Sequence, residues 1–271
     1  MEDLQPIILA MLASGLLAGF LAGMLGIGGG IVTVPILFTA FGAIGVPAEV
    51  QMHLTVATSL AIIVPTAIFS ARGHGARGAL SVAMMKSWGP WVALGAIAGA
   101  WAATILDTRA LIGFFAVMAF LMGLKLFLPL DDKVIGDGPP RGVFGAAIGG
   151  LIGLFSSLMG IGGATFSVPV MTLYGMPMHR AVGTAAVLGL VISAPATLGY
   201  MIGGWGHPGL PPWSLGYVNL AGVLIIAPAA MAMTPLGVAT AHKLSHRRLS
   251  LLFGLFLFIA AGRMALPLLG Y

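Results

Sequence analysis

The sequence contains no cysteine and very few charged residues. The absence of cysteine excludes disulfides, thiolate metal ligands and a cysteine nucleophile. Only 7% of the 271 residues are charged, whereas a typical soluble domain has about 25%. Because so few charges could not cover the surface of a soluble fold, and 59% of the residues are hydrophobic, the composition predicts an integral membrane protein.

Acidic side chains are also missing from the apolar stretches, since Glu49 and Asp107 lie only near segment ends. A cation transporter usually places a carboxylate within the membrane, so this absence favours an anionic substrate. The basic residues are scattered among short loops, which gives no indication of a nucleic acid partner. The ionisable residues in or beside the apolar stretches are His53, Arg72, His74, Lys86, Lys125, His179, Arg180 and Arg263.

Ten apolar segments, five in each half of the chain, predict an all-α fold. A spanning helix needs about 20 apolar residues, and the second segment of each half is too short. We therefore expect broken or re-entrant helices and eight to ten crossings. The polar stretch 131–141 predicts a linker between two transmembrane repeats, 1–130 and 142–271. The segments are 6–26, 30–42, 51–70, 80–105 and 109–130, followed by 142–160, 164–175, 180–203, 214–241 and 248–268.

An odd number of crossings in each half would insert the two halves in opposite directions, as inverted repeats. Lysine and arginine gather in the loops of one side, which is the cytoplasmic side by the positive-inside rule. This assignment places the amino terminus outside. The first segment lacks the basic region and cleavage site of a signal peptide, so we expect it to be retained as a helix.

A glycine–proline motif occurs once in each half, as GIGGGIVTVP (Gly26–Pro35) and GIGGATFSVP (Gly160–Pro169). Glycine and proline are unfavourable inside a helix, so each copy predicts an interruption. The amides freed at the start of the next helix, together with its dipole, can bind an anion. Alternatively, the glycines only permit close helix packing. The duplication continues with HLTVATSL from His53 and HRAVGTAA from His179.

The predicted substrate-binding residues combine the motif backbone with nearby hydroxyl and basic side chains. We also consider His53 and His179 as carriers of a coupling proton near neutral pH, or as anchors of helix ends. Arg180 is either a ligand or a marker of the cytoplasmic side, and Lys125 and Arg263, which align with each other, are expected to reach toward an interface. No catalytic set, cofactor or metal site is predicted. The substrate-binding residues are Gly28, Gly29, Gly30, Thr33, His53, Thr58, Ser59, Gly162, Gly163, Thr165, Ser167, His179, Arg180 and Thr184.

The paired motif, with a threonine-bearing segment after each copy, resembles the TauE/SafE family, also called the 4-toluene sulfonate uptake permease family. This resemblance covers both halves and departs at Ala164, where the first copy has Gly30, and at Ala57, where the pattern often has glycine. It implies a transporter of a prokaryotic inner membrane that moves sulfite, sulfoacetate or related anions, most often outward. The positions it carries over are Gly26, Gly28, Gly29, Val34, Pro35, Gly160, Gly162, Gly163, Val168, Pro169, Thr58 and Thr184.

The leading hypothesis is a secondary transporter, not an enzyme, that exports a small sulfur-containing oxyanion from a bacterium by alternating access of the two repeats. The alternatives are a passive anion channel and an uptake permease for the same anions. The expected partners are the anion and the lipid bilayer, with a homodimer as one option for the assembly.

Overall fold

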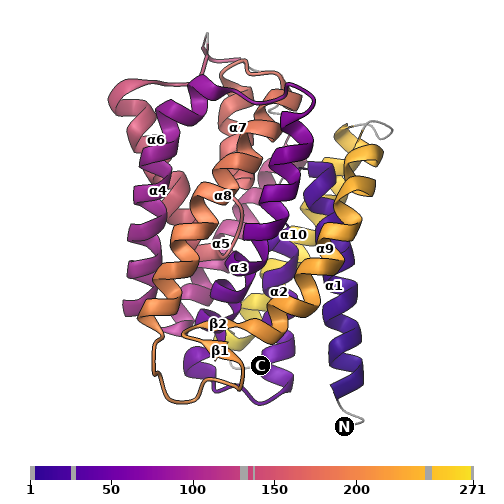
Figure 1. Ribbon diagram of the computed structural model, residues 1–271, viewed down its shortest axis with the longest axis vertical. Coiled ribbons are helices and arrows are strands. Elements are labelled where there is room, and N and C mark those ends of the chain that lie inside the picture. The colour runs from indigo at the N-terminus through magenta and orange to yellow at the C-terminus, as the bar shows by residue number, and fades with distance from the viewer. Residues whose placement is uncertain (1–3, 26–28, 129–133, 137, 242–245, 270–271) are drawn as a thin grey trace.

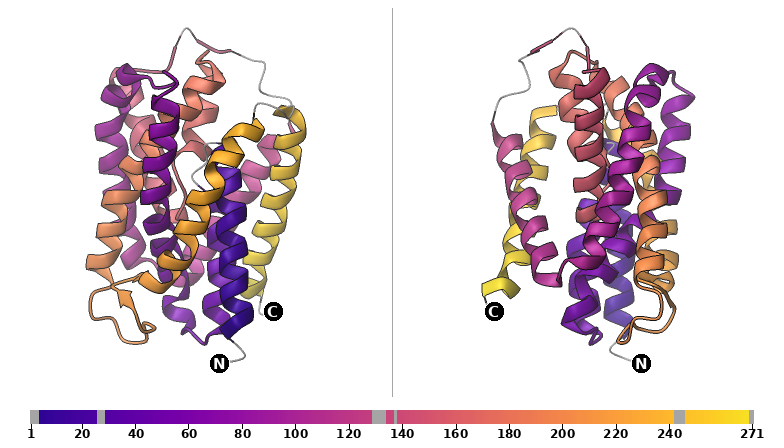
Figure 2. Two further views of the ribbon diagram at one scale, coloured as in Figure 1. Left: turned by 45° about the vertical axis from the view of Figure 1, so that its right-hand side comes forward. Right: turned by 90° about the vertical axis from the view of Figure 1, so that its left-hand side faces the viewer.

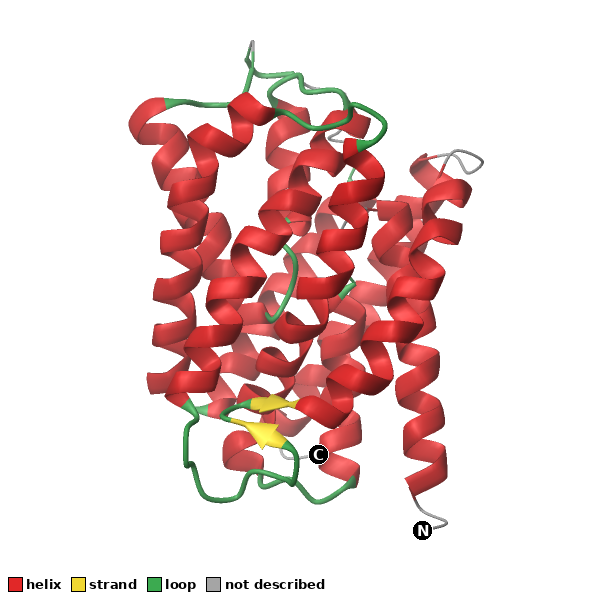
Figure 3. Ribbon diagram, in the orientation of Figure 1, coloured by secondary structure: helices red, strands yellow, loops and turns green. Residues whose placement is uncertain are grey.

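The computed structural model describes residues 4–25, 29–128, 134–136, 138–241 and 246–269, and these are mostly helical (Figures 1 and 3). The helices of the first half are α1 (Leu4–Leu25), α2 (Gly30–Ala43), α3 (Ala48–Gly75), α4 (Val82–Ile105) and α5 (Thr108–Phe127). Those of the second half are α6 (Gly142–Met159), α7 (Ala164–Leu173), α8 (Met178–Gly203), α9 (Leu220–Ala241), α10 (His246–Ala265) and the 3-10 turn η1 (Leu266–Leu269). Two short strands, β1 (Ser214–Leu215) and β2 (Val218–Asn219), precede α9.

The prediction of an all-α integral membrane protein is confirmed. Within the described residues, six helices are long and apolar enough to cross a membrane, namely α3, α4, α5, α6, α8 and the Leu220–Gly237 part of α9. Each predicted apolar segment corresponds to one helix. The prediction was wrong at the start of segment 214–241, because Ser214–Asn219 pairs as an antiparallel hairpin and α9 begins only at Leu220.

The two short helices are the second arms of two helical hairpins. α1 rises from the end of the molecule where the chain begins, and α2 returns to that end (Figure 1). α6 and α7 repeat this path from the opposite end, where the linker lies. We call these the terminal end and the linker end. With 10 residues, α7 is about 15 Å long, half of the roughly 30 Å hydrocarbon core.

The helices run in opposite directions in the two halves, because α1 starts at the terminal end and α6 at the linker end (Figure 1). Each hairpin goes into the molecule and returns to the end where it started, as two full crossings would also do. The helices that follow a hairpin therefore run in the same directions as they would if all ten segments crossed the membrane. The most extensive helix contacts are α1 with α9, α4 with α6, α5 with α10 and α3 with α8. Figure 2 shows α5 and α10 side by side on one flank. Each of these contacts joins the two halves.

The core lies around α3 and α8. Two-thirds of the most apolar window of each is buried, against 33 to 44% in the other candidate spans. Both helices begin directly after a proline, Pro47 and Pro177, which fixes their first turn. Glycines in the outer pairs serve packing, as a Cβ at Gly19 would collide with the carbonyl of Ala230, and one at Gly153 with that of Val92. Close packing therefore explains these glycines, which lie outside the repeated motif.

Candidate functional site

The second copy of the motif interrupts the helix as predicted. Gly160 ends α6 in the left-handed conformation, with φ 70°, which glycine adopts without steric cost. The chain then turns, and α7 begins at Ala164. The carbonyl of Gly163 accepts hydrogen bonds from the amides of Phe166 (3.2 Å) and Ser167 (2.8 Å), which closes the first turn of α7.

Backbone donors remain free at the start of both short helices. The amides of Gly162, Gly163, Ala164 and Thr165 have no hydrogen-bond acceptor among the described residues. In the first copy, Gly29 has φ 71°, its carbonyl accepts from Val32 and Thr33, and the amides of Gly30 and Ile31 have no acceptor within the described part of the chain. Such donors at the positive end of a helix attract anions. Gly28, which was also predicted, lies outside the described residues.

The two interruptions touch each other inside the protein. A Cβ added to Gly30 would lie 2.5 Å from the carbonyl oxygen of Gly160 and 2.9 Å from the Cα of Ile161. A Cβ on Gly160 would lie 2.9 Å from the Cα of Val56 on α3. Gly29, Gly30 and the stretch 160–165 are all buried. The structure thus brings the two motif copies together, and the backbone of the first copy packs directly against the backbone of the second.

Ser59 of α3 ties the two copies to each other. Its hydroxyl donates to the carbonyl of Gly160 over 2.7 Å and lies 2.8 Å from the hydroxyl of Thr33. Thr33 also lies 3.1 Å from the carbonyl of Gly30, to which it can donate. Both side chains are fully buried or nearly so. The predicted residues Thr33 and Ser59 therefore form one hydrogen-bonded chain across the junction.

The second copy lacks this chain. Ser167, which aligns with Thr33, is buried and its hydroxyl has no hydrogen-bond partner in the described structure. The same holds for the hydroxyl of Thr165. Ser59 aligns with Ala185, which has no hydroxyl to offer. The two half-sites are therefore unequal, with the hydroxyls of the first copy paired and those of the second copy left for another partner.

A small cavity adjoins the second interruption. Its volume is about 10 Å³, roughly the space of one water molecule. The hydroxyl of Ser70, which lines it, is buried and has no partner in the described residues. The other walls carry only apolar side chains and backbone. They are Ile63 and Ala67 of α3, Gly162 and Ala164 at the start of α7, and Ala185, Ala186 and Gly189 of α8.

The predicted residues Thr58 and Thr184 lie at joints between the halves. The hydroxyl oxygen of Thr58 accepts the amide of Asn219, just before α9, over 3.0 Å. The hydroxyl oxygen of Thr184 accepts the amide of Ser81, just before α4, also over 3.0 Å. Each threonine thus fixes the start of a helix in the opposite half. This equivalence matches their alignment in the repeat.

The two histidines do not come together. His53 is buried near the terminal end, where its Nε2 lies 3.0 Å from the carbonyls of both Ala103 and Leu106 at the end of α4. Nε2 therefore carries a proton and donates to these carbonyls, and Nδ1 lies 3.3 Å from the hydroxyl of Thr108. His179 and Arg180 are exposed in the first turn of α8, which begins at the linker end (Figure 1). Their roles as ligands or proton carriers stay predictions.

Sequence reasoning missed a polar pocket at the terminal end. It has a volume of about 540 Å³, and the β1–β2 hairpin contributes Tyr217, whose ring centroid lies 5.0 Å from that of His53. Burial raises the pKa of the Tyr217 phenol. The sequence offered no signal for this contact because the hairpin was read as helix. The ionisable side chains that line the pocket are Glu49, His53, Asp107, Arg109, His207 and Tyr217.

The buried polar side chains of the described structure are serines, threonines, Asn219 and His53, together with the aromatic residues Trp88, Tyr200 and Tyr217. No three histidine, aspartate or glutamate side chains of the described chain lie close enough to share a metal ion. The described interior thus offers hydrogen-bond donors and acceptors without a buried carboxylate, which suits the binding of a polar ligand.

Comparison with known proteins agrees with a binding interior in a membrane-spanning fold. Residues 11–264 match the family model described as sulfite exporter TauE/SafE. A probable membrane transporter protein of Haemophilus influenzae is 35% identical over 96% of this chain and 98% of its own. The probable membrane transporter protein YunE of Bacillus subtilis is 24% identical over 90% of this chain and 92% of its own. No solved structure matches significantly. The chain is a multi-pass membrane transporter protein and belongs to the TauE/SafE family.

Proposed function

We propose that this protein is a secondary transporter that moves small sulfur-containing oxyanions, such as sulfite or sulfoacetate, out of a bacterial cell. The name of the family model, sulfite exporter, supports the substrate class and the direction. The anion would bind where the two interrupted helices meet, on free backbone amides and buried hydroxyls.

One observation carries the proposal. The unpaired amides of Gly162–Thr165 and the unpaired hydroxyls of Thr165 and Ser167 lie in an interior whose described buried side chains include no carboxylate. Unpaired donors in a buried site are costly to leave unmatched, and an oxyanion would supply the missing acceptors. A cation would find no buried negative charge there to compensate the loss of its hydration.

The mechanism that fits this arrangement is alternating access. The cavity of about 10 Å³ is too small for an oxyanion. The tips of the two hairpins must therefore separate before the anion can enter. The hydroxyl of Ser59 would hold the two tips together in the closed state, because it contacts Gly160 of one hairpin and Thr33 of the other. The first and second hairpins enter from opposite ends, so each can open the junction toward its own side.

Two alternatives use the same donors. A passive anion channel needs a continuous pore, and the closed contact of Gly30 with Gly160 favours a gated transporter. An uptake permease would differ only in direction. Reconstitution into vesicles distinguishes a transporter from a channel: an imposed pH gradient should drive sulfite uphill in a transporter, and purely downhill flux would support a channel.

Binding is tested first, on the purified protein, by thermal shift with sulfite, sulfate, sulfoacetate, taurine and thiosulfate. A ligand of the native state raises the unfolding temperature by mass action, so sulfite or sulfoacetate should raise it and the zwitterion taurine should not. Gly162→Leu, which projects a side chain from the cavity wall, should abolish both the shift and transport. Gly262→Leu, on α10 with open space around it, is the control. Wild-type transport by Gly162→Leu would refute the site.

A further inference from the structure

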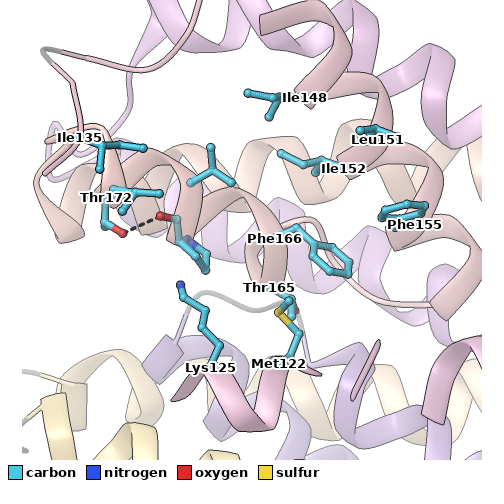
Figure 4. A pocket seen from close by; sticks show the side chains of 13 residues that line it. Met122, Lys125, Ile135, Ile148, Leu151, Ile152, Phe155, Thr165, Phe166 and Thr172 are labelled. Carbon is cyan, nitrogen blue, oxygen red and sulfur yellow. Dashed lines mark hydrogen bonds between the residues drawn. The ribbon is translucent and has the colours of Figure 1, made fainter. Parts of the chain in front are cut away.

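Two grooves lie on the flanks of the molecule, outside the junction of the two motif copies. One residue of the proposed transport site, Thr165, also lines one of them. The α7 groove lies between α5, α6 and α7 and has a volume of about 500 Å³. Figure 4 shows its apolar side chains, among them Leu151, Phe155 and Phe166, with Lys125 reaching in from α5. The α2 groove lies between α1, α2 and α10, has a volume of about 400 Å³, and includes Ile36, Ile259 and Arg263.

The grooves occupy equivalent places in the two halves. Pro35 of the first motif lines one and Pro169 of the second lines the other. Each groove contains a single charged residue, and these two, Lys125 and Arg263, align in the repeat. Lys125 lies in the last turn of α5 and Arg263 in the last turn of α10. Because α5 ends at the linker end and α10 at the terminal end, the two cations lie near opposite faces of the membrane.

The lining of the grooves determines what they can hold. Their surfaces are almost wholly apolar, so a small hydrated oxyanion would lose its water without gaining donors. An amphiphile would bury its tail along the groove and keep a negative head beside the cation. The flanks around both grooves are suited to lipid, since Leu151 is 52% exposed and Ile259 is 62% exposed.

We propose that each groove binds one acyl chain of an anionic glycerophospholipid, whose headgroup phosphate lies at Lys125 in one leaflet and at Arg263 in the other. Charge complementarity selects an anionic headgroup over a zwitterionic one. The bound chains would brace α7 and α2, the short arms of the hairpins. This assignment stands whether or not the transported substrate is a sulfur oxyanion.

Native mass spectrometry of the full-length protein in detergent, with equal amounts of phosphatidylglycerol and phosphatidylcholine, tests the proposal. Wild type should retain up to two phosphatidylglycerol molecules in preference to phosphatidylcholine. Lys125→Gln and Arg263→Gln should each lose one of them, with affinity at that site about fivefold weaker. Lys125→Arg and Arg263→Lys should retain both, and Leu151→Trp or Ile259→Trp should block one groove without removing a charge.

Arg109→Gln is the matched control, because Arg109 lies in the first turn of α5 and lines the pocket at the terminal end instead of a groove. It should leave lipid retention unchanged. Equal retention of both lipids by wild type would overturn the proposal, as would unchanged retention in the two glutamine variants. Inorganic phosphate is added in a further arm, and displacement of the lipid by phosphate alone would indicate a simple ion site and overturn it too.

Discussion

At the scale of single residues, the interior depends on hydroxyl groups that are paired on one side of the junction and unpaired on the other. The hydroxyl of Ser59 donates to Gly160, and that of Thr33 can donate either to Ser59 or to the carbonyl of Gly30. Ser167, in the equivalent position of the second motif, has no described partner. A hydroxyl can donate to an anion or hold a backbone carbonyl. Under the proposed function, the first copy holds the backbone and the second copy donates to the anion.

Ser59→Ala should destabilise the closed junction. It leaves the buried carbonyl of Gly160 without its donor, which costs about 1–3 kcal/mol, while Thr33 keeps the carbonyl of Gly30 as acceptor. The measurement is thermal unfolding in detergent. Ser193→Ala, which removes a buried hydroxyl that has no described partner, is the control and should change stability little. Equal losses in the two variants would contradict the role given to Ser59.

Ala185→Ser should act in the opposite direction. Ala185 aligns with Ser59, and Ser167 aligns with Thr33. A hydroxyl at position 185 should therefore pair with Ser167 as Ser59 pairs with Thr33. One new buried hydrogen bond is worth about 0.5–1.5 kcal/mol. Unfolding temperature should rise while anion affinity falls, because Ser167 is then occupied. A rise in both quantities would show that Ser167 is not a ligand.

At the scale of elements, the interrupted helices are set by backbone conformation as much as by side chains. Gly160 and Gly29 both adopt positive φ at the ends of the hairpin tips, and the next helix starts within a few residues. The short arms α2 and α7 each contain a proline, Pro35 and Pro169. These arms are too short to cross a membrane, so the tips must end inside the protein.

Gly160→Ala should disrupt the junction more than an equally strained substitution elsewhere. A left-handed alanine costs about 1–2 kcal/mol, and here its Cβ would also lie 2.9 Å from the Cα of Val56. Gly45→Ala measures the backbone strain alone, because Gly45 has φ 78° and nothing lies within 4 Å of an added Cβ. We expect Gly160→Ala to lose transport and more unfolding free energy than Gly45→Ala. Matching losses would mean that the tips are not in close contact.

At the scale of the whole molecule, basic residues outnumber acidic ones at the linker end, whereas the terminal end carries both signs, with Arg109 beside Glu49 and Asp107 in one pocket. α3 ends and α6 and α8 begin at the linker end (Figure 1), and Arg72, Arg77, Arg141 and Arg180 lie in or beside these helix ends. The two acidic residues outside the linker and the amino terminus lie at the terminal end, with Glu49 in the first turn of α3 and Asp107 just before α5. By the positive-inside rule the linker end faces the cytoplasm. We therefore propose an inner-membrane orientation in which the chain begins in the periplasm.

Single cysteines test this orientation, because the chain has none of its own. Pro208→Cys, in the exposed loop before the β-hairpin at the terminal end, should react with a membrane-impermeant thiol reagent on intact spheroplasts. Ala76→Cys, in the exposed loop after α3 at the linker end, should react only after the membrane is opened. The reverse pattern would place the amino terminus in the cytoplasm.

Three properties could be predicted from the sequence alone: insertion into a membrane, the ten helical segments, and the position of each helix interruption. These are local properties, since glycine and proline break a helix wherever they occur and an apolar run is read from its own residues. The start of α9 was misread for the same reason, because apolarity alone does not distinguish the β-hairpin at Ser214–Asn219 from a helix.

Only the tertiary structure decided which groups meet. Ser59 finds its acceptor on Gly160, 101 residues away, and His53 caps α4 while His179 remains exposed at the other end. The hydroxyls of Thr58 and Thr184 accept amides of the opposite half. The physical reason is that a hydrogen bond depends on the relative placement of whole helices, which is fixed by long-range packing and not by the residues adjacent in sequence.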